Sequence, residues 1–257
     1  MKYNKTYDVI VIGGGHSGVE AACASSRIGA KTALITHKFD TIGEMSCNPA
    51  IGGLGKGHLV REIDALDGIM ARAIDNSGIQ FRTLNSSRGP AVRGPRAQAD
   101  RSLYKKSIQE MLKNQKNLEI IQGSVEDLDI KKNTVCGVLL SNKEKLICKS
   151  AVLTTGTFLR GMIRIGKKSI PAGRVGDKPS VNLAKKIESL KFSIGRLKTG
   201  TPPRIDKKSI YFNNLEKQLA DKDPKPFSFL HNFIHTPQIP CFLTSTNKLT
   251  HKIIEKS

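Results

Sequence analysis

Acidic residues are scarce in this sequence. Among 257 residues, 22 aspartates and glutamates stand against 42 lysines and arginines, so the formal net charge is +20. This excess is larger than solubility requires and favours a polyanionic partner, of which nucleic acid is the leading candidate. A lysine-rich genome would produce the same excess as scattered, solvated charges. Composition alone leaves both interpretations open.

Paired cysteines and long apolar runs are also missing. The five cysteines are widely spaced, odd in number and form no CxxC motif, which indicates a reducing compartment rather than a disulfide scaffold or a zinc site. No apolar run is long enough to span a bilayer, and the polar residues 1–6 are unlike a signal segment. We therefore expect a cytoplasmic protein with no membrane association and no metal ligands.

A glycine-rich turn near the N-terminus is typical of a dinucleotide-binding βαβ unit. An apolar run over residues 7–12 precedes it, and an Ala-rich helix over 19–27 and a second strand over 31–36 follow it. In such a unit the glycines permit the tight turn, the approach of a pyrophosphate and close helix–strand packing, while the helix N-terminus attracts the anion. The residues predicted to bind the dinucleotide are Gly13, Gly14, Gly15, His16, Ser17 and Gly18. For His16, a packing or helix-start role is favoured over an effect on the cofactor.

The carboxylate that commonly binds the adenosine ribose is missing at its usual place. About 20 residues beyond the glycines, the sequence has Thr36 and His37. Asp40 is the nearest carboxylate, but a hydroxyl or an imidazole could equally form this hydrogen bond. The sequence leaves the ribose contact unassigned.

A second glycine-rich loop, residues 44–58, contains Cys47. Its glycines, proline and asparagine disfavour regular helix or strand and let backbone N–H groups approach a ligand. A thiol among such residues, close to a cofactor, is expected to be reactive, so Cys47 is the predicted catalytic residue. In contrast, Cys23 and Cys136 are predicted to be buried and inert.

The remaining pattern predicts an α/β fold, a Rossmann-like domain with a parallel sheet and a β-meander. Helical spacing occurs over 59–73 and 97–113, with an arginine-containing loop, 86–96, between them. The predicted strands are 118–121, 124–130, 134–141 and 145–148 in the meander, followed by a buried strand, 151–157. Ser180 is predicted to cap a helix that ends near residue 190. The stretch 160–208 is the most basic region, and together with the arginine loop it is a candidate RNA-binding face.

Six motifs together closely resemble the MnmG family, formerly called glucose-inhibited division protein A. The motifs are the glycine turn 13–18, the Cys47 loop, Gly78-Ile79-Gln80-Phe81-Arg82, Gly89-Pro90-Ala91-Val92-Arg93, Gly173-Arg174-Val175-Gly176-Asp177 and the segment from Arg196 to Arg204. The resemblance covers nearly the whole chain, but members of that family are more than twice as long. The chain therefore resembles an N-terminal fragment, with an FAD-binding domain over 1–204 and the incomplete start of a second, insertion domain over 205–257.

The resemblance implies an FAD-dependent enzyme that adds a carboxymethylaminomethyl or aminomethyl group to carbon five of the tRNA wobble uridine. Family members use NADH and methylenetetrahydrofolate, work with a GTPase partner and form homodimers at full length. Cys47 matches a family cysteine implicated in catalysis, while Val125 and Ser180 match positions that contact FAD. A second family cysteine and the nicotinamide-binding segment would fall beyond Ser257, so we expect the chain alone to be incomplete as an enzyme.

Two alternatives stay open at this stage. The chain could be a non-catalytic remnant that binds FAD or RNA, because a flavin site without its closing segment loses contacts. It could also belong to a related flavoprotein, the folate-dependent uridine methyltransferase. A disulfide reductase is disfavoured, because Cys47 lacks a CxxxxC partner.

Overall fold

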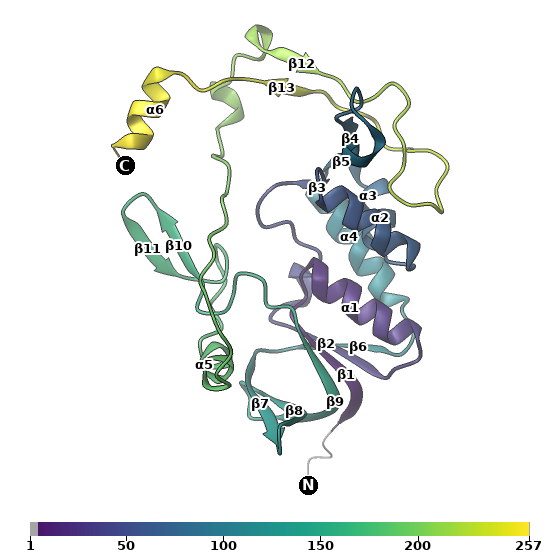
Figure 1. Cartoon of the computed structure of the whole chain (residues 1–257), viewed down its shortest axis with the longest axis vertical. Helices are drawn as coiled ribbons and strands as arrows, with labels where there is room; N and C mark the ends of the chain where they lie inside the picture. The colour runs from purple at the N-terminus through teal and green to yellow at the C-terminus, as the bar shows by residue number, and fades with distance from the viewer. Residues whose placement is uncertain (1–4, 257) are drawn as a thin grey trace.

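A mixed six-stranded sheet organises the first half of the molecule (Figure 1). The computed structural model describes residues 5–256. The strands, in spatial order, are β6 (Leu118–Gln122), β2 (Thr32–Thr36), β1 (Thr6–Ile12), β9 (Lys145–Leu153), β8 (Thr134–Leu140) and β7 (Val125–Lys131). The first four are parallel, whereas β8 and β7 are antiparallel to their neighbours. The predicted α/β fold with a largely parallel sheet and a meander is therefore confirmed.

Two strand predictions need correction. The segment 118–121 is not part of the meander, because β6 pairs in parallel with β2 at the sheet edge. The segment 145–148 and the first three residues of the segment 151–157 belong to one strand, β9, which ends at Leu153. The end of β9 is also not buried, since Val152 and Leu153 are 37% and 43% exposed. Hydropathy indicated the strand correctly, but the turn residues in its middle do not break it.

The helix α1 (His16–Arg27) connects β1 to β2 as the glycine turn predicts. Gly29, with φ +93°, directly follows its last turn, and the N–H of Ala30 donates to the carbonyl of Ser25. These are the features of a glycine-terminated helix, because a positive φ lets the chain turn back and satisfy the last carbonyl groups. The chain then enters β2 directly.

A smaller antiparallel sheet, β3 (Ala50–Gly52), β5 (Gly94–Ala99) and β4 (Gly78–Leu84), lies beside the helices α2 (Lys56–Ala65), α3 (Met70–Asp75) and α4 (Arg101–Lys113). The predicted helix from 97 is wrong at its start, because residues 94–99 form β5. The helix begins after Asp100, whose carboxylate accepts from the N–H groups of Ser102 and Leu103 at 2.8 and 3.0 Å. The loop 44–58 likewise contains β3 and the first turn of α2.

The predicted helix over 59–73 is two helices. The chain breaks at Asp67, which has φ 65°, and α3 then starts with its backbone donors bound by a residue of another helix. The carboxylate of Glu20 on α1 accepts from the N–H of Ile69 at 3.0 Å and from that of Met70 at 2.6 Å. Helical periodicity cannot reveal a cap from a residue 50 positions away. The sequence therefore predicted one helix where the structure has two.

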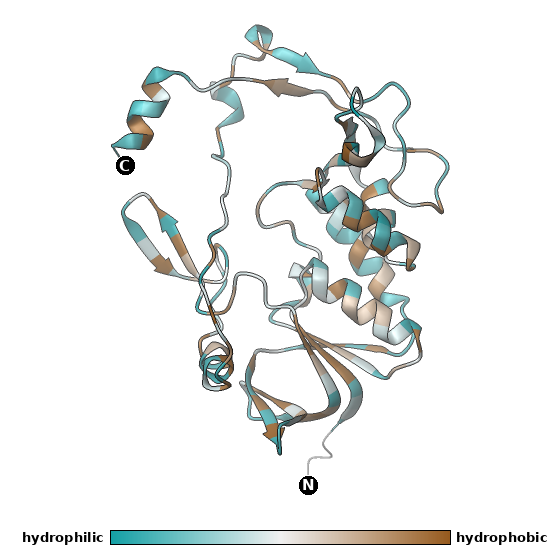
Figure 2. Ribbon diagram, in the orientation of Figure 1, coloured by the Kyte–Doolittle hydropathy of each residue, from teal (hydrophilic) through white to brown (hydrophobic). Residues whose placement is uncertain are grey.

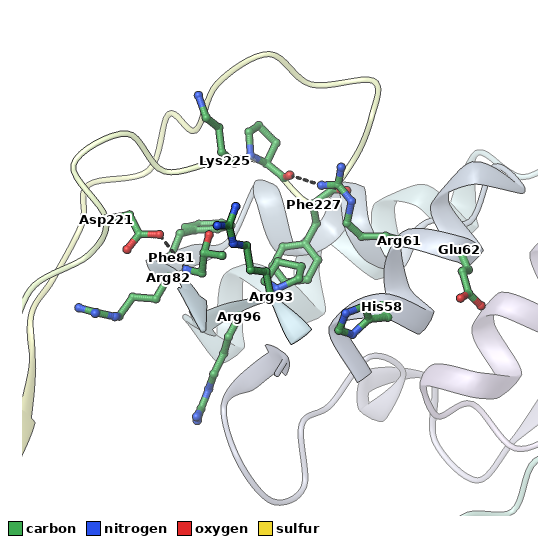
Figure 3. A pocket seen from close by; sticks show the side chains of 13 residues that line it. His58, Arg61, Glu62, Phe81, Arg82, Arg93, Arg96, Asp221, Lys225 and Phe227 are labelled. Carbon is green, nitrogen blue, oxygen red and sulfur yellow. Dashed lines mark hydrogen bonds between the residues drawn. The ribbon is translucent and has the colours of Figure 1, made fainter. Parts of the chain in front are cut away.

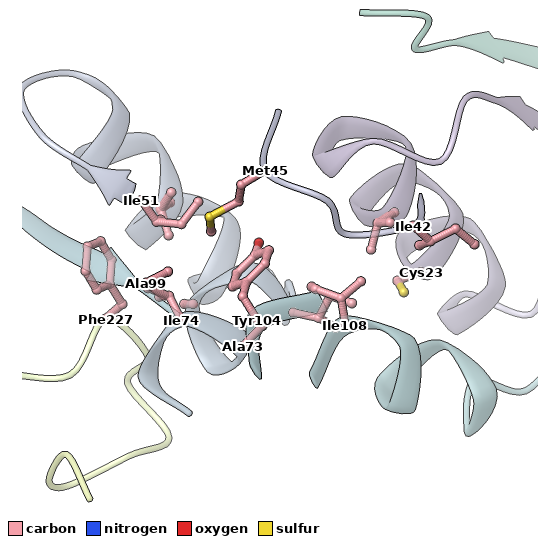
Figure 4. Close-up of a cluster of buried hydrophobic side chains, with 14 of the residues drawn as sticks. Cys23, Ile42, Met45, Ile51, Ala73, Ile74, Ala99, Tyr104, Ile108 and Phe227 are labelled. Atoms are coloured by element: carbon pink, nitrogen blue, oxygen red, sulfur yellow. The ribbon is translucent and has the colours of Figure 1, made fainter. Parts of the chain in front are cut away.

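The hydrophobic core joins the helices to the smaller sheet (Figure 4). Tyr104 and Ile108 of α4 lie at its centre, with Cys23 of α1 at one end and Phe227 at the other. A second cluster lies on the other side of the sheet and includes Ile10, Ile35 and Val138. Figure 2 shows the brown, hydrophobic stretches that these strands and helices carry.

The later part of the chain is more open. It contains the hairpins β10 (Met162–Ile165) with β11 (Lys168–Pro171) and β12 (Glu216–Gln218) with β13 (Cys241–Leu243), and the helices α5 (Asn182–Ser189) and α6 (Lys248–Glu255). Short 3₁₀ turns occur at Phe39–Thr41, Pro90–Val92, Lys207–Ser209 and Phe212–Asn214. Residues 192–206 form neither helix nor strand and are exposed.

Residues beyond 204 nevertheless pack onto the first part of the chain. Phe227 is fully buried in the core cluster, and its N–H donates to the carboxylate of Asp75 at 2.7 Å. The N–H of Asp221 donates to the carbonyl of Phe81, and that of Ile239 to the carbonyl of Ile79. The division into domains at residue 204 stays a prediction.

Candidate functional site

The carboxyl ends of β1, β2 and β9 open into a cavity of about 420 Å³. Its wall is formed by the turn 13–17 after β1, by Thr36 and His37 at the end of β2, and by residues 153–158 at the end of β9. Val125 and Ser180 also line it. Seven of the eight residues predicted to bind the dinucleotide therefore surround one space. In α/β folds, ligands bind at this edge of the sheet.

Gly18, the eighth, lies behind the cavity and has a packing role. A Cβ atom there would lie 1.8 Å from the carbonyl oxygen of Gly13 and 2.7 Å from Oγ1 of Thr154. Gly13 itself has φ +115°, and the hydroxyl of Thr154 donates to its carbonyl at 3.1 Å. The turn, the start of α1 and the end of β9 are therefore in direct contact, which only glycine allows at these two positions.

Gly15 faces open space. Apart from its two chain neighbours, no atom of residues 5–256 lies within 4 Å of the position where its Cβ would be, and no side chain of these residues caps the N-terminus of α1. The first N–H groups of this helix consequently have neither an intrahelical nor a side-chain acceptor, and the helix dipole adds partial positive charge. This arrangement suits a phosphate or pyrophosphate group.

The adenosine side of the cavity has the residues that the sequence left open. Thr36 is buried and His37 lies edge-on to Phe158, with ring centroids 5.3 Å apart. Burial lowers the pKa of His37, so its imidazole is neutral and can both donate and accept a hydrogen bond. Asp40 does not line the cavity. Thr36 and His37 are therefore the better placed candidates for a ribose contact.

A half-buried ion pair at the cavity was not predicted. Arg174 and Asp177 both line it, and Nε of Arg174 donates to Asp177 at 2.6 Å. Burial opposes the charge of Asp177, but hydrogen bonds from Arg174 and Lys38 hold its pKa below its ordinary value. The motif 173–177 was visible in the sequence as a turn, but only the fold shows that it faces the cavity. Arg174 is therefore not a free cation of the basic stretch.

Val125 and Ser180 contribute differently. Val125 is buried at the start of β7, so its contact with a ligand would come from the backbone. Ser180 does not cap α5 as predicted, because Val181 occupies the cap position and no side chain bonds there. Instead, its backbone is tied to Phe158 and Arg160, and the structure records no hydrogen bond by its hydroxyl. That hydroxyl is available to a ligand.

His16 starts α1 and lines the cavity. Its ring meets Tyr104 edge-on at a centroid distance of 5.6 Å, and Nδ1 lies 3.5 Å from the tyrosine oxygen. Burial, followed by the nearby charge of Lys56, lowers the pKa of His16 to about 4. The ring is therefore neutral at pH 7 and adds no charge to the anion site. This agrees with the packing and helix-start role favoured from the sequence.

Cys47 does not itself line the cavity, although Glu44 and Ser46 of the same loop do. Its Sγ atom donates to the carbonyl of Gly200 at 3.1 Å and lies 3.8 Å from Oγ1 of Thr201. The side chain is half-buried. The thiol thus lies near the cavity and in contact with the segment 192–206, a neighbour that periodicity could not reveal.

Two arginines hold the backbone of Cys47. Nη2 of Arg101 donates to its carbonyl oxygen at 2.6 Å, and Nη2 of Arg204 donates to the same oxygen at 3.3 Å. Two guanidinium groups therefore lie beside the backbone of this loop.

The other cysteines differ in burial. Cys23 and Cys148 are buried, whereas Cys136 is half-buried, so the predicted burial of Cys136 is wrong. Burial, followed by the charge of Glu20, raises the pKa of Cys23 to about 11. Within residues 5–256, no three His, Cys, Asp or Glu side chains are grouped so that they could hold a metal ion. In the same part of the chain, no helix has the length and apolar character needed to cross a membrane.

Three comparisons with known proteins agree with one another. A family model described as "Glucose inhibited division protein A" matches residues 8–257. The curated "tRNA uridine 5-carboxymethylaminomethyl modification enzyme MnmG" of Granulibacter bethesdensis is 58% identical over 251 residues, which are 96% of this chain and 40% of that protein. The crystal structure of Aquifex aeolicus GidA matches all of this chain and 43% of its own, with a TM-score of 0.94 and 47% identity. A GidA-related protein of Thermus thermophilus shares the fold, with a TM-score of 0.53 at 20% identity over 73% of this chain and 69% of its own.

Proposed function

We propose, because the chain belongs to the glucose inhibited division protein A family, that it forms the FAD-binding part of an enzyme that modifies carbon five of the wobble uridine in tRNA. The chain spans about 40% of the length of the curated relative, so the activity of a whole protein is part of this proposal. The observation that carries it is the cavity at the carboxyl edge of the sheet, with the uncapped start of α1 on one side and Cys47 beside it.

The residues at the cavity fit FAD. The open face of Gly15 and the N–H groups that follow it would bind the pyrophosphate. Thr36 and His37 would bind the ribose, the backbone of Val125 would meet the adenine, and the Ser180 hydroxyl would bind another part of the cofactor. When bound, FAD would supply redox chemistry beside the substrate uridine.

Cys47 would act on the uridine as a nucleophile or a proton donor. Arg101 and Arg204 fix its backbone, and the Gly200 carbonyl accepts the hydrogen bond of the thiol, which orients the sulfur. The segment 192–206 partly covers the thiol and would reduce its contact with water.

Further parts of the proposal concern the assembly. NADH would reduce the flavin and methylenetetrahydrofolate would supply the one-carbon unit, with a GTPase partner and a homodimer as the working form. A tRNA substrate and five cysteines without a disulfide favour a cytoplasmic location. The NADH, methylenetetrahydrofolate, GTPase and homodimer parts of the proposal rest on the family alone.

Flavin binding tests the first part of the proposal. Purified chain should carry or take up FAD, and FAD at 100 times its dissociation constant should raise the free energy of unfolding by about 2.7 kcal/mol. Gly15→Ala should fold normally but bind FAD weakly, because its methyl group would project into the phosphate position. Gly195→Ala is the matched control, since its methyl group also meets open space but lies far along the chain in an exposed segment. A chain without flavin absorbance and without stabilisation by FAD would refute the cofactor assignment.

Activity tests the second part. The chain is expressed with a polypeptide that matches the remaining length of the curated relative, in bacteria that lack their own enzyme, and wobble-uridine modification is measured by mass spectrometry of tRNA. Cys47→Ser should abolish the modification without loss of flavin, whereas Cys136→Ser should retain it. Full modification by the Cys47→Ser protein would remove the catalytic assignment.

A further inference from the structure

A second cavity, of about 430 Å³, lies between α2, the β4–β5 pair and the segment 221–227 (Figure 3). It shares no lining residue with the cofactor cavity. Five cationic side chains and two carboxylates line it, an excess of three positive charges. The cations are Arg61, Arg82, Arg93, Arg96 and Lys225. We call this cavity the arginine pocket.

The four arginines keep unused hydrogen-bond donors. Among the described residues, none of them has a carboxylate oxygen within 4.0 Å. Arg61 donates to the carbonyl groups of Pro226 and Phe227, Arg82 to that of Leu219 and Arg93 to that of Arg88. A guanidinium group has five N–H donors, so these bonds fix the side chains and leave donors for a ligand.

Two further observations point to a ligand. Nε2 of His58, in the wall of the pocket, is buried without a hydrogen-bond partner, which a native structure seldom tolerates unless water or a ligand completes the site. Asp221, one of the two carboxylates, already accepts from the N–H of Thr83 at 2.7 Å. Neither carboxylate forms an ion pair with these arginines among the described residues, and the wall keeps its excess of positive charge.

The directions of the side chains distinguish a chain of phosphates from a small anion. In Figure 3, Arg61 and Arg93 extend toward the segment that carries Lys225, whereas Arg82 and Arg96 extend away from it in two other directions. One phosphate ion could not meet all four groups. A strand with a phosphate at every nucleotide could, and its bases would not stack here, because Phe81 and Phe227 are buried under the floor.

The pocket also adjoins the loop that carries Cys47. Arg96 belongs to the wall of the pocket and pairs with Gly52 of β3, the strand into which the Cys47 loop leads. We propose that the arginine pocket binds the phosphate backbone of the tRNA strand next to the nucleotide that reaches Cys47. This inference rests on the proposed function and adds to it a location for the RNA strand. It also differs from the basic stretch 160–208, which the sequence alone favours.

The test measures tRNA affinity against salt concentration for the chain loaded with FAD. The pocket variant is Arg82→Gln with Arg93→Gln, and the control is Lys131→Gln with Lys132→Gln at the β7–β8 turn, at the other end of the molecule in Figure 1. Both lose two charges. The pocket variant should bind about tenfold more weakly, and its slope of log K against log salt should fall by about 0.7 for each lost contact. The control should stay within about twofold of the unmodified chain. Lys225→Gln, whose side chain forms an ion pair with Asp223, provides a second variant should the arginines prove necessary for folding.

The outcomes are distinct. Equal losses of tRNA affinity in the pocket variant and the control would overturn the inference. The affinity would then depend on net charge and not on the position of the charges. Competition by uridine monophosphate as effective as that of tRNA would also overturn it, since the pocket would then bind a single nucleotide. If the unmodified chain binds FAD but no tRNA, the proposed RNA substrate fails as well. Stabilisation by FAD shows in each case that the variant is folded.

Discussion

At the scale of single residues, burial separates the thiol of Cys47 from those of Cys23 and Cys148. Burial raises the pKa of both buried thiols, whereas Cys47 is half-buried beside Arg101 and Arg204. Iodoacetamide at pH 7.5 should therefore modify Cys47 first, at least about tenfold faster than Cys23 and Cys148, because only the thiolate reacts. Site-resolved mass spectrometry over time measures the rates. Equal labelling of Cys23 in the folded chain would contradict this assignment.

His16 makes the stability of the fold depend on pH. The unfolded chain binds a proton to this residue with the ordinary pKa of 6.5, whereas burial lowers the pKa in the folded chain to about 4. The unfolded chain therefore holds more protons between these values, so stability is complete above pH 6.5 and is lost as the pH falls toward 4. The loss should reach about 2–3 kcal/mol.

Urea unfolding between pH 4.5 and 7.5 measures this contribution. His16→Asn keeps a hydrogen-bonding side chain of similar shape toward Tyr104 but cannot titrate. The difference in unfolding free energy between the two proteins should therefore shrink as the pH falls. A difference that is constant over this range would show that His16 does not carry the effect.

At the scale of elements, Asp75 joins α3 to the returning segment 227–231. Its carboxylate is buried and accepts from the N–H groups of Phe227 and Ser228, at 2.7 and 2.9 Å, and contacts Nδ1 of His231 at 2.9 Å. Asp75→Asn should lower the free energy of unfolding by about 2–4 kcal/mol, because an amide nitrogen would face donors. His231→Asn, which loses one contact at the edge of this group, should cost about 1 kcal/mol. Denaturant unfolding compares the two, and equal losses would contradict the central role of Asp75.

The same element-scale view shows what the sequence could predict. The βαβ unit was predictable, because the apolar run over residues 7–12, the glycine turn and Gly29 are local signals. The start of α4 at Asp100 and the break before α3 were not, because strand pairing of β5 and the cap from Glu20 are contacts between distant parts of the chain.

The candidate site likewise has features that local sequence signals predict and features that depend on contacts between distant parts of the chain. The glycine turn was visible as a motif, whereas the Arg174–Asp177 pair and the cover of Cys47 by Gly200 depend on how the chain returns to the sheet. The role of Ser180 as a helix cap was wrong for a local reason, since α5 begins two residues later.

At the scale of the whole molecule, the chain is held together across an exposed connection. Residues 192–206 have no helix or strand, and Leu197 is 99% exposed. Beyond them, Phe227 is fully buried in the core, and the N–H of Phe229 donates to Asp64 at 2.7 Å. The connection is therefore open to a protease, while the segment that follows it belongs to the folded core.

Limited trypsin digestion should accordingly cut first after Arg196 or Lys198, because these residues lie in the exposed connection. The two fragments should still elute together in size-exclusion chromatography, since cleavage of the connection leaves Phe227 buried and the bonds to Asp64 and Asp75 in place. The Asp75→Asn protein, cut in the same way, should release the second fragment more readily. The cut chain should also label faster at Cys47, because Gly200 would no longer be held over the thiol. Fragments that separate at once in the unmodified protein would show that the core does not hold the returning segment.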